Sequence, residues 1–504
     1  NGSSNTKYCG GNLVAVGEVD RPVNHRHVIK GARKEYVPFL FDHAEHRWAL
    51  DHLNHRMPSV LSTEAFYADL LKYDQPITVG MIDEALYLRT LKVMVGILKD
   101  AGFPSNIEYI WDAQVIAADL NRQSAMGACY HGKKAAWLDA ISGEKLELAF
   151  QESLRRIHEK KMGVWTGSLK AELRPKAKVL AKKTRVFTAA PIDVLFGAKA
   201  LVDNFNNTFY ANHLRGPWTV GINKFCKGWD RLAKSFNHDW VFLDADGSQF
   251  DSSLSPVLFQ MVCELRHQFM ESDDFAAGLL ENLYTQIVYT PISTIDGLVV
   301  KKFKGNNSGQ PSTVVDNTLI LIFVIEYCRI FIKEQIGVDL TFKFVANGDD
   351  LLINCPREEA KIIQNSFPEI MSFMGLKYSF DDLHETIETV EYMSHKFVKR
   401  GDMYIPKLDK ARITSILEWE RNEDLSAQIS ALNAARIEAW GYDDVYRLCD
   451  DFLKSFVADN HIGDHLYIPE EFIEALYTGD CSELMSKFPA DWFEGDSKEF
   501  VEFQ

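Results

Sequence analysis

The sequence has 504 residues and eight cysteines, but no two of them form a C-x-x-C pair. This absence argues against a disulfide framework and against a structural zinc site. Long hydrophobic runs are missing as well, since the longest in the central region, Leu319 to Ile325, is too short to cross a bilayer. The first residues lack the basic-then-apolar pattern of a secretory signal. The sequence therefore predicts no transmembrane segment.

Positive charge is in deficit, with 55 Lys and Arg against 71 Asp and Glu and a net charge of −16. The chain as a whole thus differs from a basic nucleic-acid binder. One stretch, from Ser168 to Arg185, departs from this balance because it contains a single acid, Glu172. Its cations, called here the basic strip, are Lys170, Arg174, Lys176, Lys178, Lys182, Lys183 and Arg185. We expect a phosphate channel here, with one exposed helix face as the alternative.

The remaining composition, 46% hydrophobic and 25% charged, is that of a globular protein with about two to four structural units. Apolar spacing from Ile82 to Leu98 predicts a helix that ends near Gly102 and Pro104. A similar spacing at Ile413, Ile416 and Leu417 predicts helices in the last fifth of the chain.

Two adjacent carboxylates, Asp349 and Asp350, follow an Asn-Gly step between two apolar runs in the segment from Phe344 to Ile353. Asn-Gly is a strong signal for a tight β-hairpin whose central residues both take positive φ. The pattern therefore predicts a hairpin with two aspartates at its tip. Neighbouring aspartates repel each other, so a bound cation or good solvation is needed there.

A third carboxylate, Asp246, comes at the end of the apolar run Trp240 to Ala245, which predicts a buried strand. Such a strand can place Asp246 next to the hairpin that carries Asp349 and Asp350. Three carboxylates in this arrangement would hold two Mg²⁺ ions about 3.5–4 Å apart, as in phosphoryl transfer.

Polar residues also precede and begin a predicted helix after Gly305. Thr313 and Asn317 lie four residues apart, and therefore on one face of that helix. Next to a metal site this face can bind a sugar hydroxyl, and a helix cap with surface polar residues is the alternative. A small-residue loop from Gln123 to Lys134 lets the backbone approach a phosphodiester chain, or is a plain connection.

These motifs, in this order, resemble those of viral RNA-dependent RNA polymerases. Asp246-x4-Asp251 is similar to motif A, Ser308-Gly309 with Thr313 and Asn317 to motif B, and Gly348-Asp349-Asp350 to motif C. The basic strip resembles motif F, Ser124 to Lys134 motif G, and Tyr392 to His395 motif E. The likeness is greatest to the nuclear inclusion b (NIb) polymerases of the potyvirus family and covers roughly residues 80 to 420.

The resemblance implies a role for each matched residue. Asp246 and Asp349 would be the principal ligands of two Mg²⁺ ions, for which Mn²⁺ substitutes, and Asp350 would support them. Asp251, Asn317 and Thr313 would recognise the ribose. Residues of the basic strip would bind the nucleoside triphosphate, namely Lys170, Arg174, Lys178, Lys183 and Arg185. The template and loop positions would be Ser124, Gly127, Ser308 and Gly309. His384 is the candidate general acid, although it is one residue out of register with the lysine of the family.

The fold that the resemblance implies is α+β, a right-hand polymerase whose palm is an antiparallel sheet backed by helices. Fingers are expected from residues 1–204, of which 1–75 form an N-terminal extension, and from an insert at 286–304. The palm is expected at 205–285 and 305–400, and the thumb with a C-terminal tail at 401–504.

The implied function is replication of a positive-strand RNA virus genome from nucleoside triphosphates on an RNA template. Expected partners are RNA template and product, a viral genome-linked protein as primer, and a viral protease that releases the chain from a polyprotein. The expected location is the host cytoplasm, at membrane-associated replication complexes, with the host nucleus as a second site. Two other classes share some of these features, namely a reverse transcriptase, which usually blocks the 2′-OH with a bulky ring, and a non-catalytic scaffold.

Overall fold

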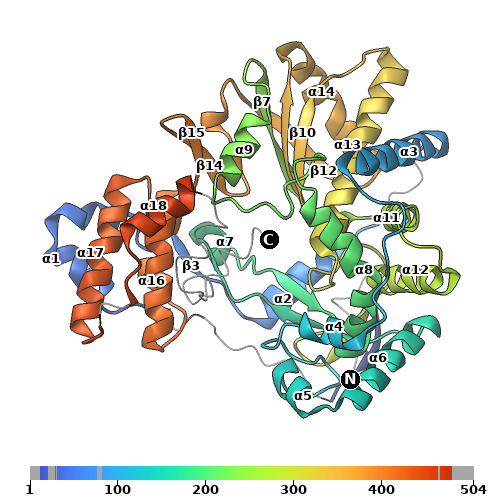
Figure 1. Cartoon of the computed structure of the whole chain (residues 1–504), viewed down its shortest axis with the longest axis horizontal. Coiled ribbons are helices and arrows are strands. Elements are labelled where there is room, and N and C mark those ends of the chain that lie inside the picture. Colours follow the sequence, from blue (N-terminus) through green and yellow to red (C-terminus); the bar gives the residue numbers. More distant parts are fainter. Residues whose placement is uncertain (1–11, 21–28, 30, 77–81, 464–465, 480–504) are drawn as a thin grey trace.

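The structure is a computed structural model that describes residues 12–20, 29, 31–76, 82–463 and 466–479 (Figure 1). Release of the chain from a polyprotein by a viral protease would leave processed ends, and both ends of the chain, residues 1–4 and 501–504, lie outside these ranges. Within the described ranges, no helix combines the length and the hydrophobicity needed to traverse a lipid bilayer.

The predicted palm contains a four-stranded antiparallel sheet in the order β10-β11-β7-β12. These strands are β10 (Lys343–Asn347), β11 (Asp350–Cys355), β7 (Val241–Ser248) and β12 (Lys377–His384). Helices α11 (Pro256–His267), α13 (Thr313–Ile336) and α14 (Arg357–Phe373) join the sheet in one hydrophobic core. Helix α13 is buried along most of its length, which explains why its apolar residues occur on all sides.

A second, five-stranded sheet has the order β1-β9-β8-β4-β6. Its strands are β1 (Leu13–Glu18), β9 (Leu298–Lys302), β8 (Pro291–Ser293), β4 (Trp165–Leu169) and β6 (Val186–Ala189). The segment expected as a fingers insert therefore supplies β8 and β9, which lie between strands of the N-terminal part. Helices α6 (Gly143–His158), α8 (Ile192–Ala211) and α12 (Asp274–Val288) pack on one another in the same half of the molecule (Figure 1).

The predicted thumb is helical and shares its core with part of the predicted N-terminal extension. Its helices are α15 (Lys410–Glu418), α16 (Leu425–Ala439), α17 (Asp443–Asp459) and α18 (Glu470–Thr478). Helix α1 (Tyr36–Asp42) and the 3-10 helix η2 (Ala44–His52) pack against them, and strand β2 (Gly31–Ala32) pairs with β16 (Trp419–Glu420) (Figure 1). This association follows from apolar side chains such as Tyr36, Phe39 and Leu40, which are buried in one core together with the thumb helices.

Local signals account for several element boundaries. Helix α3 (Glu84–Ala101) begins after Asp83, whose side chain accepts a hydrogen bond from the Leu86 amide, and ends at Gly102 with φ of 109°. These are an N-cap and a left-handed C-terminal glycine, so the predicted helix is present. The predicted thumb helix at Ile413 to Leu417 corresponds to α15.

Candidate active site

The β10–β11 hairpin carries the adjacent carboxylates, but its turn differs by one residue from the prediction. Asn347 pairs with Asp350, so the two central turn residues are Gly348 and Asp349 rather than Asn347 and Gly348. Of these two, Gly348 alone has positive φ, at 59°. The expected turn with two positive-φ residues is therefore wrong, because β10 continues through Asn347, whose side chain donates to the Thr219 hydroxyl at 3.1 Å.

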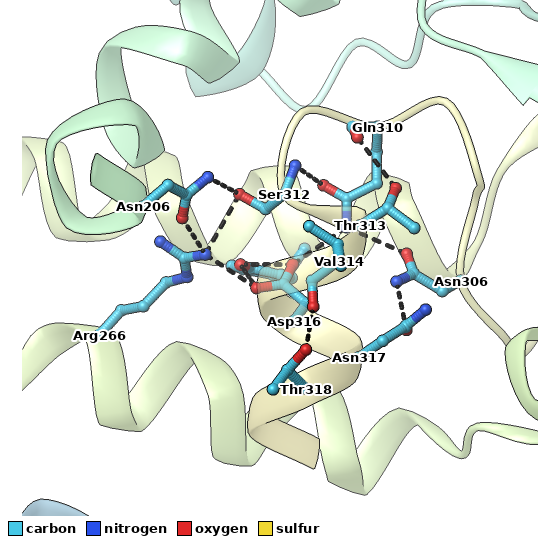
Figure 2. Close-up of polar contacts among 11 residues, drawn as sticks. Asn206, Arg266, Asn306, Gln310, Ser312, Thr313, Val314, Asp316, Asn317 and Thr318 are labelled. Carbon is cyan, nitrogen blue, oxygen red and sulfur yellow. Dashed lines mark hydrogen bonds and ion pairs between the residues drawn. The ribbon is translucent and has the colours of Figure 1, made fainter. Parts of the chain in front are cut away.

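The hairpin tip is fixed to helix α13. The amide of Gly348 donates a hydrogen bond of 2.8 Å to the hydroxyl of Thr318, a fully buried residue. Thr318 in turn donates to the carbonyl of Val314 at 2.6 Å (Figure 2). The carboxylates are consequently held by backbone that is anchored to the most buried helix of the palm.

Strand β7 places Asp246 opposite this hairpin. Leu352 of β11 pairs with Asp244 of β7 in antiparallel register. Antiparallel partners advance one residue each in opposite directions, so the same register brings Asp246 level with Asp350. On the other side of β7, Asp246 pairs with Ser379 of β12. The three predicted metal ligands therefore come together at the same end of the sheet.

Desolvation by the surrounding palm makes the cluster of Asp246, Asp349 and Asp350 unfavourable on its own. It raises the pKa of Asp350 to about 7, with a further contribution from the charge of Asp349, and it raises the pKa of Asp349 as well. A divalent cation would remove this repulsion, and carboxylate oxygens are the donors that Mg²⁺ prefers. The residues present therefore fit Mg²⁺, with Asp246, Asp349 and Asp350 as the donor set.

The predicted ribose-reading pair is formed. The Nδ2 group of Asn317 donates to Oδ1 of Asp251 at 2.6 Å, and burial raises the pKa of Asp251 to about 6. Thr313 does not join them, because its hydroxyl donates to the carbonyls of Asn307 and Gln310, at 2.6 and 2.9 Å. Thr313 thus closes the loop before α13 rather than presenting its hydroxyl beside Asn317.

The loop that contains Ser308 and Gly309 lies against strand β6. The Gly309 amide donates to the Thr188 carbonyl at 2.8 Å, and the Thr188 amide donates to the Ser308 hydroxyl at 3.2 Å. A Cβ atom at Gly309 would lie 2.4 Å from that carbonyl oxygen, so only glycine fits. The loop is therefore held against β6, the edge strand of the five-stranded sheet.

The basic strip faces the carboxylates through Arg185. Its guanidinium pairs with Glu172, Nε lying 2.7 Å from Oε1 and Nη2 binding Oε2. The positive charge of Arg185 opposes the rise in pKa of both Asp251 and Asp349, which places it near both carboxylates. Burial, followed by the charges of neighbouring cations, lowers the pKa of Lys178. These neighbours are Arg174, Lys183, Lys72 and Arg185. Lys170 also pairs with Glu172, its Nζ atom lying 3.6 Å from Oε2.

Comparison of the chain with models of known protein families is consistent with this arrangement. The family model described as viral RNA-dependent RNA polymerase matches residues 33–457. The chain belongs to this family. The polymerase is 46% identical over 496 residues, 97% of its length, to the genome polyprotein of Sweet potato mild mottle virus (isolate Salazar). It is 43% identical over 477 residues, 93% of its length, to the genome polyprotein of Plum pox potyvirus (isolate NAT).

The polymerase spans only a small part of these relatives, 14% and 15% of their lengths. Among solved structures, it is similar to the Sicinivirus 3Dpol RNA dependent RNA polymerase. That likeness has a TM-score of 0.69 at 17% identity and covers 94% of this chain and all of the other. The right-hand polymerase fold is therefore confirmed.

The candidate general acid of the polymerase, His384, lies at the end of β12. Its Nε2 atom is 2.7 Å from Oδ2 of Asp244, and its Nδ1 atom is 2.7 Å from the Thr389 hydroxyl. Both ring nitrogens are thus engaged, one by strand β7 and one by the 3-10 helix η4 (Ile387–Thr389). His384 pairs with Phe242 in the sheet, four residues before Asp246 along β7, and its role as the acid stays a prediction.

The predicted loop positions Ser124 and Gly127 belong to a compact turn next to α8. The Ser124 hydroxyl accepts a hydrogen bond from Nζ of Lys134 at 2.7 Å. Gly127 has φ of 126°, and a Cβ atom there would lie 2.8 Å from Pro191. Both residues therefore shape the loop, and their contact with template stays a prediction.

Two residues of the site, Tyr378 and Lys302, were not predicted from the sequence. The hydroxyl of Tyr378 in β12 donates to the Asp349 carbonyl at 2.5 Å, and a Cβ atom at Gly247 would lie 2.6 Å from its ring. The buried Nζ group of Lys302 donates to four backbone carbonyls that join the end of α12 to the start of the motif B loop. Nothing in the sequence marks either residue, because neither belongs to a motif and both act through backbone atoms.

Proposed function

We propose that this polymerase copies the genome of a positive-strand RNA virus by two-metal-ion nucleotidyl transfer. The observation that carries the proposal is the placement of Asp349 and Asp350 side by side at the hairpin tip, level with Asp246 at the same end of the palm sheet. Such a set is unfavourable unless it binds cations. In the reaction a bond forms between the RNA 3′-oxygen and the α-phosphorus, while the bond from that phosphorus to the bridging oxygen of pyrophosphate breaks.

The proposed Mg²⁺ ions would be held by Asp246 and Asp349, with Asp350 in support, and when bound they supply Lewis-acid stabilisation of charge on the reacting phosphate. Arg185, with Arg174, Lys170, Lys178 and Lys183, binds the triphosphate, since guanidinium groups match phosphate oxygens in pairs. Asp251 and Asn317 bind the ribose 2′-OH, a contact that a deoxyribose leaves unmade. His384 is proposed to donate the proton that pyrophosphate takes up on leaving.

Initiation and processing are proposed from the family alone. The primer is a viral genome-linked protein whose Tyr hydroxyl accepts the first nucleotide. A viral protease releases the chain, in keeping with the match to segments of genome polyproteins. The proposed site of action is the membrane-associated replication complex of the host cytoplasm, with a nuclear pool. Fluorescence imaging of the tagged chain in infected cells tests this location, and a purely nuclear signal would contradict it.

The decisive experiment is nucleotide incorporation by the purified protein on a primed heteropolymeric RNA template with Mg²⁺. Wild type should extend with ribonucleotides, Asp349→Ala should be inactive, and Asp251→Ala should lose mainly its preference for ribose. Asp339→Ala is the matched control, because this Asp side chain is 78% exposed and its partner, Lys333, lies 3.4 Å away on the surface. Equal RNA binding by wild type and Asp349→Ala, with no incorporation by either, would favour the scaffold alternative.

A further inference from the structure

Asn306, which lies in the loop before α13, is held at every polar atom and is fully buried. Its amide donates to the carbonyl of Asp251 at 2.8 Å, and its carbonyl accepts from the Tyr73 hydroxyl at 2.8 Å. Its side-chain Oδ1 accepts from Nε2 of Gln310 at 3.0 Å. Its Nδ2 donates to Oδ1 of Asn317 at 2.8 Å (Figure 2). Asn306 therefore contacts both residues of the ribose-reading pair.

The direction of these hydrogen bonds is set from a buried ion pair at the other end of the network. Nη2 of Arg266 lies 2.8 Å from Oδ1 of Asp316, and both side chains are almost completely buried. Oδ2 of Asp316 accepts from Nε2 of Gln310 at 3.0 Å, while Oε1 of Gln310 accepts from the Ser312 amide at 2.9 Å. Because a carboxylate only accepts and a backbone amide only donates, the side-chain amide of Gln310 has one possible orientation.

The orientation of the Gln310 side-chain amide determines that of Asn306, and the orientation of Asn306 determines that of Asn317. Gln310 presents an N–H group to Asn306, so Asn306 offers its oxygen there and its N–H group to Asn317. Asn317 must then accept with Oδ1 and is left to donate with Nδ2, which it does to Asp251. If the Asn317 amide turned over, its oxygen would face the carboxylate of Asp251, and two acceptors would repel each other.

We propose that Asn306 is a positioning residue for sugar selection, which fixes the amide of Asn317 so that it donates to Asp251. The carboxylate oxygen that Asn317 leaves unused then accepts from the 2′-hydroxyl of the incoming ribonucleotide. This inference rests on the proposed function, in which Asp251 and Asn317 bind that hydroxyl. It assigns to the buried network of Figure 2 a part in substrate choice rather than in folding alone.

The test variant is Asn306→Asp, which keeps the shape but replaces the N–H group with a second acceptor. Asn317 is then forced to turn its N–H group toward position 306 and its oxygen toward Asp251. The matched control is Asn307→Asp in the same buried loop. The Nδ2 group of Asn307 donates to the Ile287 carbonyl and the Thr290 hydroxyl, at 3.1 and 2.9 Å, and not to Asn317.

The readout is the ratio of kcat/KM for a ribonucleoside triphosphate to that for the matching deoxyribonucleoside triphosphate, measured on a primed RNA template. Asn306→Asp should lower this ratio at least about tenfold, the effect of losing one buried hydrogen bond to substrate. Asn307→Asp should lower both kcat/KM values and leave the ratio unchanged, since a purely structural change affects both sugars alike. An unchanged ratio in folded Asn306→Asp overturns the proposal.

Two further variants keep the test decisive. If Asn306→Asp fails to fold, the uncharged Asn306→Ala takes its place, because it removes the same donor, and an unchanged ratio again overturns the proposal. Asp251→Ala separates the two levels of inference. If Asp251→Ala lowers the ratio and the Asn306 variants do not, Asn306 has no part in selection while the proposed ribose contact stands. If Asp251→Ala leaves the ratio unchanged, the ribose contact itself is refuted, and the role of Asn306 with it.

Discussion

Lys224 and Glu438 form a buried ion pair across 214 residues of sequence, Nζ of the lysine donating to both carboxylate oxygens at 2.7 and 2.9 Å. The two side chains are 3% and 2% exposed. Lys224 also donates to Nε2 of His395, whose Nδ1–H group donates to the Met393 carbonyl. The Met393 amide in turn donates to Oδ2 of Asp350 at 2.9 Å. Hydrogen bonds thus connect thumb helix α16 to the β10–β11 hairpin.

Glu438→Ala should reduce the free energy of unfolding by about 3–5 kcal/mol, because it leaves the ammonium group of Lys224 buried without its counter-charge. Lys224→Met combined with Glu438→Leu should be less destabilised than Glu438→Ala, since no buried charge then remains. Urea denaturation followed by fluorescence measures both values.

The control for this prediction is Glu385→Ala. Glu385 pairs with Arg357, but both side chains are 62% exposed. Loss of such a solvated pair should cost less than about 1 kcal/mol. Equal destabilisation by Glu438→Ala and Glu385→Ala would contradict the assignment of Lys224–Glu438 as the stabilising pair.

A second prediction concerns pH and Lys407, whose Nζ donates to the carbonyls of Glu438 and Trp440 and to the Tyr477 hydroxyl. Burial lowers the pKa of Lys407 from 10.5 to about 7, although the charge of Glu438 acts in the other direction. Between these two values the unfolded chain binds a proton that the folded chain lacks. The stability of the wild type relative to Lys407→Met should therefore rise with pH, by at most about 1.4 kcal/mol per pH unit.

Urea denaturation of both proteins at several values between pH 7 and pH 9 measures this difference. Below pH 7 the difference should become constant, because Lys407 is then protonated in both states. A difference that stays constant between pH 7 and pH 9 would contradict this prediction, because it would show that Lys407 is charged in the folded protein throughout this range.

The sequence predicted which carboxylates come together better than it predicted the geometry of the turn between β10 and β11. The three aspartates, Asp246, Asp349 and Asp350, were identified because each follows an apolar run that predicts a strand. Such a run covers enough residues for the strand to be recognised in the sequence. The turn was predicted one residue too early, because the Asn-Gly preference is local and strand pairing at Asn347 overrides it.

Contacts between segments that lie far apart along the chain could not be predicted from the sequence. The spacing of Thr313 and Asn317 predicted correctly that both residues lie on a helix. It did not predict that the Thr313 hydroxyl donates to carbonyls of the loop before that helix, because helical spacing carries no information about the loop. In the same way, Tyr36 and Leu40 are visibly apolar, yet nothing local indicates that they pack against thumb helices nearly four hundred residues later.

A third prediction concerns Thr318, which anchors the β10–β11 hairpin that carries Asp349 and Asp350. Thr318→Val keeps the shape but removes the hydroxyl that accepts from Gly348, so it should destabilise the protein by about 1–3 kcal/mol and lower kcat. Thr318→Ser retains the hydroxyl and should recover most of the lost kcat. Steady-state incorporation measures kcat, and a Val variant with wild-type turnover would show that this anchor does not position Asp349.

The last prediction concerns Arg185, which binds both carboxylate oxygens of Glu172 through Nε and Nη2. Glu172 thereby holds the guanidinium plane in one orientation near Asp251 and Asp349, where the triphosphate is proposed to lie. Arg185→Lys keeps the charge but loses the planar pair of donors, so KM for nucleoside triphosphates should rise about tenfold while kcat changes less.

Steady-state incorporation at varied nucleotide concentration measures this effect. The control is Lys182→Ala, a cation of the same basic strip that is 51% exposed and pairs with Glu64 instead, at 2.8 Å. Lys182 pairs with Glu64, which is not one of the three site carboxylates. Loss of this exposed pair costs little energy, so Lys182→Ala should leave KM within about twofold of wild type. If the two variants raised KM equally, the strip would act through its total charge, and the paired geometry of Arg185 and Glu172 would have no part in nucleotide binding.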